Sequence, residues 1–149
     1  MDLQIIKGSE EYLRAGAYYV RIQAMAKAHG IALEEEIDRR DGPSCHYVLV
    51  LDGSFPVGTC RWFETAEKTA EIGRVVVLPE YRGQGIGRMA VQAAEQWIRE
   101  SFCSKIVLSS RDVAASFYEK LGYHYNAQHQ AHSDTFPCVY MEKIISCRS

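Results

Sequence analysis

The sequence is poor in the features that mark several large classes of protein. Its five cysteines are odd in number and form no C-x-x-C pair, which favours reduced thiols in a cytoplasmic protein over a disulfide framework. No apolar run reaches the length of a transmembrane helix, and the first residues lack the charged-then-apolar form of a signal peptide. A net charge of -2 gives no basic surface for nucleic acid or an anionic membrane. We therefore expect neither nucleic acid nor a membrane as a partner.

What the sequence does contain is the composition of an ordinary globular domain. Hydrophobic residues make up 47% and charged residues 24% of the 149 residues, and this length suits one domain with a sizeable core. The chain has no repeat, linker or low-complexity stretch. We expect a single domain over residues 1–149, present as a monomer or a homodimer.

The most informative stretch runs from Arg74 to Arg99. Its first part, Val75–Leu78, is apolar and mostly β-branched, as in a buried strand, and Pro79 ends that strand. A glycine-rich loop follows. Apolar residues then recur at helical spacing opposite a polar face, which predicts an amphipathic helix with the apolar positions Ile86, Met89, Ala90, Ala93, Ala94, Trp97 and Ile98.

A helix N-terminus lined with glycines favours an anion. Its first N–H groups have no partner inside the helix, and the helix dipole adds partial positive charge there. Glycines let a phosphate approach the backbone closely. A P-loop would need Gly-Lys-Ser/Thr where this chain has Gly-Arg-Met, and the three loop glycines do not have the G-x-G-x-x-G spacing of a dinucleotide fingerprint. The pattern that fits is R-x-x-G-x-G, with Arg82, Gly85 and Gly87; the alternative is a turn that merely starts a helix.

The rest of the chain alternates between apolar strand patterns, helical spacing and turn residues. Because a helix separates the fourth and fifth strands, they should be parallel. Ser9 is expected to cap a helix to about Ala28, stopped by Gly30, and Asp112–Leu121 is expected to be a helix stopped by Gly122. The charged segment Ala32–Asp41 should be solvated, with one or two helical turns. Strands are expected at Leu3–Lys7, His46–Leu51, Val57–Phe63, Thr69–Leu78, Lys105–Ser109, Tyr123–Gln128 and Val139–Ile145, with a polar connection over Glu64–Lys68 and a loop over Ala131–Pro137.

Two motifs in this order carry a family resemblance. The loop resembles the acyl-CoA pyrophosphate loop of the GNAT superfamily of N-acetyltransferases. About thirty residues later, Ala114–Tyr123 closely matches that family's A-x-x-F-Y-x-K-x-G-F/Y pattern. The resemblance implies the GNAT fold across nearly the whole chain. That is a three-layer mixed α/β fold, with a six- to seven-stranded sheet, helices on both faces, and parallel strands four and five that splay apart.

The resemblance also implies an activity. Acetyl-CoA would be the co-substrate, its acetyl group would pass directly to an amine of a small molecule or peptide, and no metal would be needed. The amine must lose a proton before it attacks. Tyr118 matches the family tyrosine that protonates the departing thiolate. Glu71, eleven residues before Arg82, is the candidate base, and by alternation it should share a face with Val75 and Val77. The N–H of Val77 is the candidate oxyanion donor, carried over by position.

The acyl-CoA site follows from the same resemblance. Pantetheine would pair with the backbone of the fourth strand like an added strand, and the phosphates would lie in the loop. Many members have Asn where this chain has Arg111, which could reach a phosphate instead. The expected contacts are Val75, Val76, Val77, Arg82, Gly83, Gln84, Gly85, Ile86, Gly87, Arg88 and Arg111.

Several alternatives remain open at this point. Tyr118 could be a core tyrosine, and Glu71 a carboxylate at a solvated strand end. Weaker candidates for the base are His46, Glu64 and Asp134. Metal binding by His129, His132 and Asp134 is a weak possibility; with the acidic stretch Glu34–Asp41, their loop is expected to shape the acceptor side, where an acidic rim would suit a cationic amine. The competing functions are a non-catalytic acyl-CoA-binding or sensor module and a dinucleotide-binding oxidoreductase.

Overall fold

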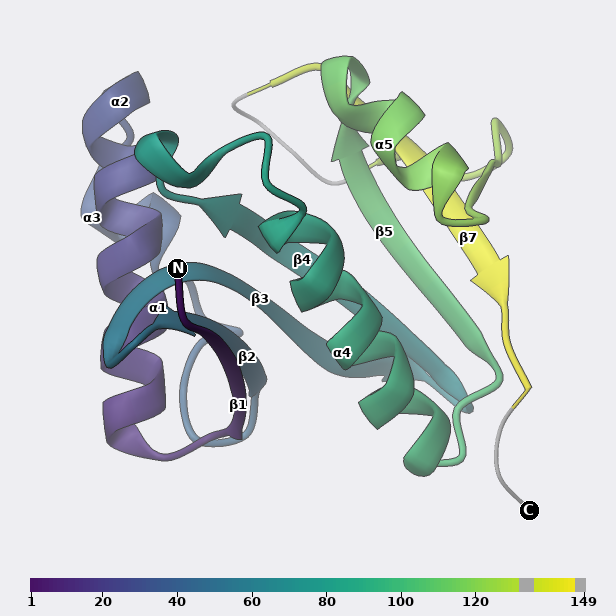
Figure 1. Cartoon of the computed structure of the whole chain (residues 1–149). Coiled ribbons are helices and arrows are strands. Elements are labelled where there is room, and N and C mark those ends of the chain that lie inside the picture. The colour runs from purple at the N-terminus through teal and green to yellow at the C-terminus, as the bar shows by residue number, and fades with distance from the viewer. Residues whose placement is uncertain (132–135, 147–149) are drawn as a thin grey trace. The chain divides into compact units, whose positions relative to one another are not determined.

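The computed structural model describes residues 1–131 and 136–146 (Figure 1). Its strands form one mixed seven-stranded sheet in the order β1-β2-β3-β4-β5-β7-β6. The strands are β1 Leu3–Gly8, β2 His46–Asp52, β3 Phe55–Ala66, β4 Thr69–Val77, β5 Lys105–Arg111, β6 His124–Tyr125 and β7 Cys138–Ile144. The helices are α1 Glu11–Arg21, α2 Lys27–His29, α3 Leu33–Glu36, α4 Ile86–Glu100 and α5 Ala115–Lys120, with a π-helical turn at Ile22–Ala26 and 3₁₀ turns at Pro79–Tyr81 and Asp112–Ala114.

The expected sheet is confirmed in its main features. Strands β4 and β5 are parallel, whereas β1–β2, β2–β3, β5–β7 and β6–β7 are antiparallel. Two strand boundaries were predicted wrongly. Strand β3 continues to Ala66, so Glu64 lies in a strand rather than in a polar connection. Strand β6 is only two residues long, because the chain leaves the sheet after Tyr125.

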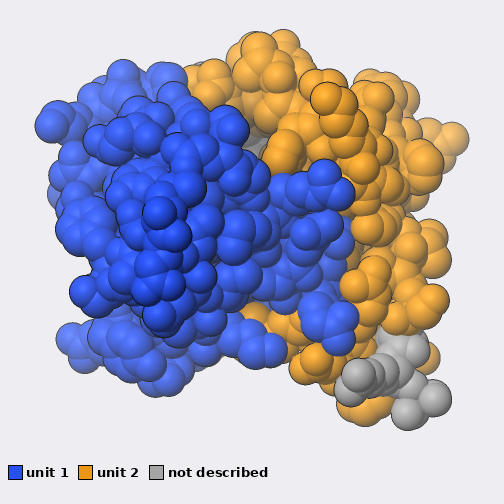
Figure 2. All heavy atoms as spheres, in the orientation of Figure 1, with its two compact units in different colours: residues 1–63, 74–96 blue, residues 64–73, 97–149 orange. Residues whose placement is uncertain are grey.

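Two compact units divide the chain (Figure 2). Unit 1 comprises residues 1–63 and 74–96, and unit 2 comprises residues 64–73 and 97–149. The boundary cuts β4 between Gly73 and Arg74. Each unit is described by itself below.

In unit 1, helices cover both faces of the sheet. A Cβ atom at Gly16 of α1 would lie 2.6 Å from the side chain of Leu49 in β2. A Cβ atom at Gly58 of β3 would lie 2.5 Å from the side chain of Ile86, the first residue of α4, and 3.7 Å from Cβ of Val50. Because Leu49 and Val50 are consecutive in a strand, they point to opposite faces. Helices α1 and α4 therefore pack on opposite sides of these strands, as the three-layer prediction requires.

The first helix begins and continues differently from the prediction. Ser9 does not cap it: Glu10 is the N-cap residue, and the Ser9 hydroxyl donates to the carbonyl of Cys45 instead. After Arg21 the helix widens into the π-helical turn Ile22–Ala26. Gly30 ends it in the left-handed conformation with φ = 67°, as expected for a helix stop.

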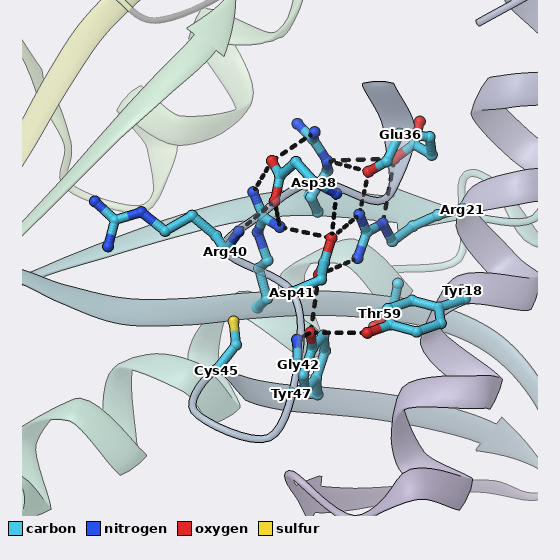
Figure 3. A network of polar contacts seen from close by, with 12 residues as sticks. Tyr18, Arg21, Glu36, Asp38, Arg40, Asp41, Gly42, Cys45, Tyr47 and Thr59 are labelled. Carbon is cyan, nitrogen blue, oxygen red and sulfur yellow. Dashed lines mark hydrogen bonds and ion pairs between the residues drawn. The ribbon is translucent and has the colours of Figure 1, made fainter. Parts of the chain in front are cut away.

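A buried ion-pair network fixes the segment that follows this helix (Figure 3). The Arg21 guanidinium lies 3.2 Å from the Glu36 carboxylate and 2.8 Å from that of Asp41. All three side chains are almost fully buried, at 1%, 4% and 2% exposed. The Tyr47 hydroxyl also donates to Asp41, at 2.8 Å. The prediction of a solvated segment is therefore wrong for these carboxylates.

Two further arginines complete the network from the sheet. Arg61 of β3 makes two 2.8 Å hydrogen bonds to Asp38 and an ion pair of 3.0 Å with Asp41. Arg74 of β4 bonds Asp38 at 3.1 Å and lies 3.3 Å from Glu36. Burial alone would raise the pKa of Asp41, but the hydrogen bond and charge of Arg21 and the charge of Arg61 outweigh it, so that pKa lies well below its usual range. The segment is thus held by three arginines on three different elements.

Two composition-based expectations can be compared with the described residues. Cys45, Cys60, Cys103 and Cys138 are thiols rather than disulfides, as predicted, while Cys147 lies outside the described residues. Of the helices in the described part of the chain, none has the length and apolarity needed to span a membrane.

Asp41→Asn is expected to lower the free energy of unfolding by about 3–5 kcal/mol, because it leaves buried arginine charge uncompensated. The lowered pKa of Asp41 means that its stabilisation is present above the unfolded-state pKa and is lost as pH falls through the folded-state value. The wild type should therefore lose stability below about pH 4, and the variant should lose less over the same range. Denaturant unfolding as a function of pH measures both. Glu34→Gln, at an exposed position of α3, is the control; equal pH slopes in wild type and Asp41→Asn would contradict the assignment.

Gly58→Ala is expected to destabilise the protein by about 1–3 kcal/mol, since the added methyl overlaps the side chain of Ile86 and both residues are buried. Gly73→Ala is the matched control in the neighbouring strand, because a Cβ atom there meets nothing within 4 Å. Thermal unfolding of both variants is the measurement. Equal melting temperatures would mean that α4 does not depend on this close approach.

Candidate active site

The glycine loop of unit 1 leads into α4, and its residues 82–85 are exposed. Gly83 and Gly85 adopt left-handed φ values of 77° and 79°, and a Cβ atom at either would point into open space. The Gly85 carbonyl accepts the N–H of Met89 at 3.0 Å, so Gly85 stands at the N-cap position. The N–H groups just after it have no partner within the helix. Together with the dipole of this 15-residue helix, they give this end of α4 the physical character that favours an anion.

A hydrogen bond fixes the start of the loop, and two arginine side chains lie at its ends. The Tyr81 hydroxyl donates to Asp52 at 2.8 Å, which ties the start of the loop to the hairpin between β2 and β3. Arg82 and Arg88 are exposed at the two ends of the loop, and Gln84 is also exposed. Ile86 is buried, so its contribution to an anion would come from the backbone.

Strand β4, which precedes this loop, pairs with β5 only over its first residues. The register of β4 with β5 covers three residue pairs and ends at Glu71 with Val107. Val75, Val76 and Val77 lie beyond that register, as a splayed pair of strands requires. Arg74 has a left-handed φ of 51°, which interrupts the regular pleat. The alternation of side chains between the two faces of β4 therefore does not continue from Glu71 past Arg74. That Glu71 shares a face with Val75 and Val77 stays a prediction.

In unit 2, Glu71 belongs to a half-buried polar face of the sheet. Residues directly opposite one another point to the same side, and Glu71 pairs with Val107, which pairs with Glu142 of β7. Ser109 and Tyr140 pair two residues further along β5 and β7, in the neighbouring row on the same face. Lys105 lies 3.0 Å from Glu142. We call this surface the polar face and define it by Glu71, Lys105, Ser109, Tyr140 and Glu142.

Tyr118 of α5 lies on the other side of the unit 2 sheet. The Lys143 ammonium donates to the carbonyl of Leu121, which follows α5, at 2.7 Å. Lys143 neighbours Glu142 in β7 and so points to the opposite face. Tyr118 is 9% exposed, and its ring meets those of Phe117 and Tyr123 edge to face. Glu71 and Tyr118 thus belong to opposite faces of the same unit.

Arg111, the last residue of β5, has a local partner. Its guanidinium carbon lies 4.0 Å above the ring of Phe136, while its Nε atom is buried with no hydrogen-bond partner among the described residues. Its predicted contact with a phosphate stays a prediction.

The weaker base candidates are engaged elsewhere or lie outside the described residues. The His46 ring stacks on Trp62 with centroids 4.2 Å apart, and Glu64 accepts a hydrogen bond from the Cys103 thiol at 3.6 Å. Asp134 and His132 lie outside the described residues. Within residues 1–131 and 136–146, no group of three or more His, Cys, Asp and Glu side chains is placed to hold a metal ion.

The acidic rim predicted from charge is wrong for most of its carboxylates. Glu36, Asp38 and Asp41 are neutralised by Arg21, Arg61 and Arg74 and offer no net negative surface. Sequence reasoning missed these three arginines. A signal was available for Arg61, because a charged residue inside a buried apolar strand requires an opposite charge. It also missed Tyr140, for which the sequence alone offered no signal.

Comparison with known proteins identifies a family that matches most of this chain. Residues 11–123 match the family model described as the acetyltransferase (GNAT) family. An uncharacterised N-acetyltransferase of Bacillus subtilis (strain 168), YjcF, is 34% identical over 119 residues, which cover 80% of this chain and 83% of that protein.

Solved structures agree in fold. A crystal structure of a protein described as an N-acetyltransferase from Lactobacillus plantarum superposes with a TM-score of 0.89 at 30% identity, covering 97% of this chain and 99% of that one. The PaiA N-acetyltransferase of Thermoplasma acidophilum, solved in complex with coenzyme A, has a TM-score of 0.74 at 20% identity and covers 97% and 99% of the two chains. With its parallel β4 and β5, its mixed seven-stranded sheet and this match over most of its length, the chain belongs to the GNAT family of acetyltransferases.

Proposed function

We propose that the protein transfers the acetyl group of acetyl-CoA directly to a primary amine of a small molecule or a protein. The observation that carries this proposal is the N-terminus of α4, where two glycines with positive φ leave open space beside the backbone and where the first N–H groups have no partner within the helix. That arrangement suits a pyrophosphate. The Thermoplasma acidophilum structure of the same fold contains coenzyme A, which supports acetyl-CoA as the donor.

In this proposal the donor lies along unit 1. The N–H groups from Gly83 to Arg88 receive the pyrophosphate, with charge from Arg82 and Arg88. The pantetheine arm pairs with the backbone of Val75–Val77, which lies beyond the register between β4 and β5. The N–H of Val77 then donates to the thioester oxygen as it becomes an oxyanion.

Unit 2 supplies the proton chemistry. The acceptor arrives as an ammonium ion and gives a proton to the Glu71 carboxylate, directly or through water. The neutral amine attacks the thioester carbonyl, the C–N bond forms and the C–S bond breaks. As the C–S bond breaks, the Tyr118 hydroxyl donates its proton to the departing thiolate. The nitrogen of the new amide loses its remaining extra proton, which restores the Tyr118 hydroxyl through water, and Glu71 releases its proton to solvent.

An acceptor screen tests the proposal. The loss of thioester absorbance from acetyl-CoA would be followed with polyamines, aminoglycosides, amino acids and peptides as acceptors. At least one primary amine should accelerate the loss in proportion to protein concentration. Titration calorimetry should detect binding of acetyl-CoA and none of NADH; the reverse would support an oxidoreductase and end the proposal. Binding without any consumption would instead favour a non-catalytic acyl-CoA-binding module.

Gly85→Ala is expected to weaken acetyl-CoA binding at least tenfold, or about 1.4 kcal/mol, because the methyl stands at the open surface where the pyrophosphate lies. Alanine at φ = 79° is also strained, so Gly53→Ala is the matched control: Gly53 has φ = 61°, open space, and a place in the hairpin between β2 and β3. Calorimetric titration of both folded variants is the measurement. A similar acetyl-CoA affinity in Gly85→Ala and Gly53→Ala would contradict the placement of the pyrophosphate in this loop.

Tyr118→Phe keeps the edge-to-face ring contacts and removes one hydroxyl. If that hydroxyl protonates the thiolate, kcat and kcat/KM should fall together by about 10²–10⁴-fold with acetyl-CoA affinity unchanged. A purely structural hydroxyl would instead cost about 1 kcal/mol of stability and leave turnover nearly intact. Melting temperature and kcat on the same preparation separate the two. A destabilised but fully active variant would refute the catalytic role.

A further inference from the structure

Tyr140 occupies a central position on the polar face of unit 2. Its register partner is Ser109, and the row beside it contains Glu142, Val107 and Glu71. Burial raises the pKa of the Tyr140 hydroxyl, the Lys105 ammonium opposes this, and the carboxylates of Glu142 and Glu71 add to it. The hydroxyl therefore stays protonated at neutral pH, where it can both donate and accept a hydrogen bond.

A short turn fixes the ring of Tyr140. The N–H of Asn126 donates to the Tyr140 carbonyl at 3.0 Å, and the Asn126 side-chain oxygen accepts the N–H of Gln128. This turn brings His129 onto Tyr140, with ring centroids 4.9 Å apart and an interplanar angle of 29°. Because His129 covers one side of the ring, that side is closed to a ligand, and the hydroxyl is the polar group that the side chain offers.

Two carboxylates, Glu142 and Glu71, lie on the polar face in the row next to Tyr140. Glu142 is ion-paired with Lys105 at 3.0 Å, with a quarter of its side chain exposed. Glu71 lies in the same row as Glu142, on β4, two strands away from β7 in the sheet. Among the described residues, the charged and titratable groups of this face are Lys105 from β5, Glu142 from β7, Glu71 from β4, His124 from β6, which pairs with Glu142, and His129 from the turn.

We propose that Tyr140 is the residue that orients the acceptor: its hydroxyl, held by the stacked His129, accepts a hydrogen bond from the primary ammonium of the acceptor beside Glu71. The inference rests on the proposed acetyl transfer and adds the acceptor side to it. It names a primary amine on an unbranched arm as the preferred class, because the stacked ring closes one side of the position. Branching next to the nitrogen would meet the ring edge.

The proton balance of the step is simple. The ammonium gives one proton to Glu71 while a second N–H stays hydrogen-bonded to the Tyr140 oxygen. That bond fixes the orientation of the nitrogen before it attacks. Tyr140 neither gains nor loses a proton in the step, so its contribution is to binding and orientation, whereas Glu71 carries the proton.

Tyr140→Phe tests this role. With the best amine from the acceptor screen, the variant should show an acceptor KM raised about ten- to a hundredfold, as expected for a lost hydrogen bond to a charged group. The KM for acetyl-CoA and the melting temperature should stay unchanged. The dependence of kcat on pH should keep the form that it has in the wild type, because Glu71 is intact, whereas Glu71→Gln should change it.

Tyr125→Phe is the matched control. Tyr125 pairs with Met141, so it lies on the opposite face from Tyr140, and it is 61% exposed. Its acceptor KM should equal that of the wild type. The structural alternative predicts a lower melting temperature with an unchanged acceptor KM in Tyr140→Phe, and that result would overturn the inference.

The two proposals fail in different ways. If the wild type consumes acetyl-CoA with an amine and Tyr140→Phe keeps the wild-type acceptor KM, the role of Tyr140 is wrong and acetyl transfer stands. If the wild type consumes no acetyl-CoA with any amine of the panel, acetyl transfer fails and the acceptor role of Tyr140 falls with it. A raised KM only for amines branched at the carbon beside the nitrogen would contradict the hydrogen bond and leave only a steric role.

Discussion

Charge neutralisation in the interior of unit 1 is the constraint on which the rest of that unit depends. Arg21 of α1, Arg61 of β3 and Arg74 of β4 converge on three carboxylates of one short segment. A buried charge without its partner costs several kcal/mol, so the helix, the two strands and the segment must be placed together or not at all. Arg74 has the further property of a left-handed φ. Its ion pairs offset the cost of that conformation, which lies just before the valines that lead into the glycine loop.

The chemistry divides between regions with different physical character. The loop and the N-terminus of α4 offer backbone N–H groups and positive potential, which suit phosphate. The polar face of unit 2 offers carboxylates and a hydroxyl, which suit an ammonium. Tyr118 lies apart from that polar face, in an aromatic cluster with Phe117 and Tyr123. A direct transfer needs all three kinds of group, since donor, acceptor and leaving group have different charges. Proteins of one fold can share the phosphate-binding region and differ in the region that receives the acceptor. The identity of the acceptor is therefore the property that fold similarity predicts least.

Local patterns predicted most of the fold, because apolar spacing and glycines act over a few residues. The central strand, loop and helix, the parallel β4 and β5, and the stop at Gly30 all follow from such patterns. The misses need long-range information. Ser9 turned to the Cys45 carbonyl, a partner 36 residues away, instead of capping α1. The acidic segment looked solvated because its arginine partners lie 15 to 39 residues away. The left-handed Arg74 breaks an alternation that the sequence shows as regular. The position of Tyr140 on the polar face follows only from the register of β5 with β7.

Direct transfer to an amine is the central claim, and a single-turnover experiment with acetyl-labelled acetyl-CoA tests it most directly. Protein in excess would be mixed with the labelled donor, with and without the best amine from the screen, and quenched in acid. We expect no label on the denatured protein in either case, and one labelled amide for each free CoA thiol when the amine is present. Label that stays on the protein without the amine and then passes to it would contradict direct transfer, and free thiol formed without amide would contradict an amine acceptor.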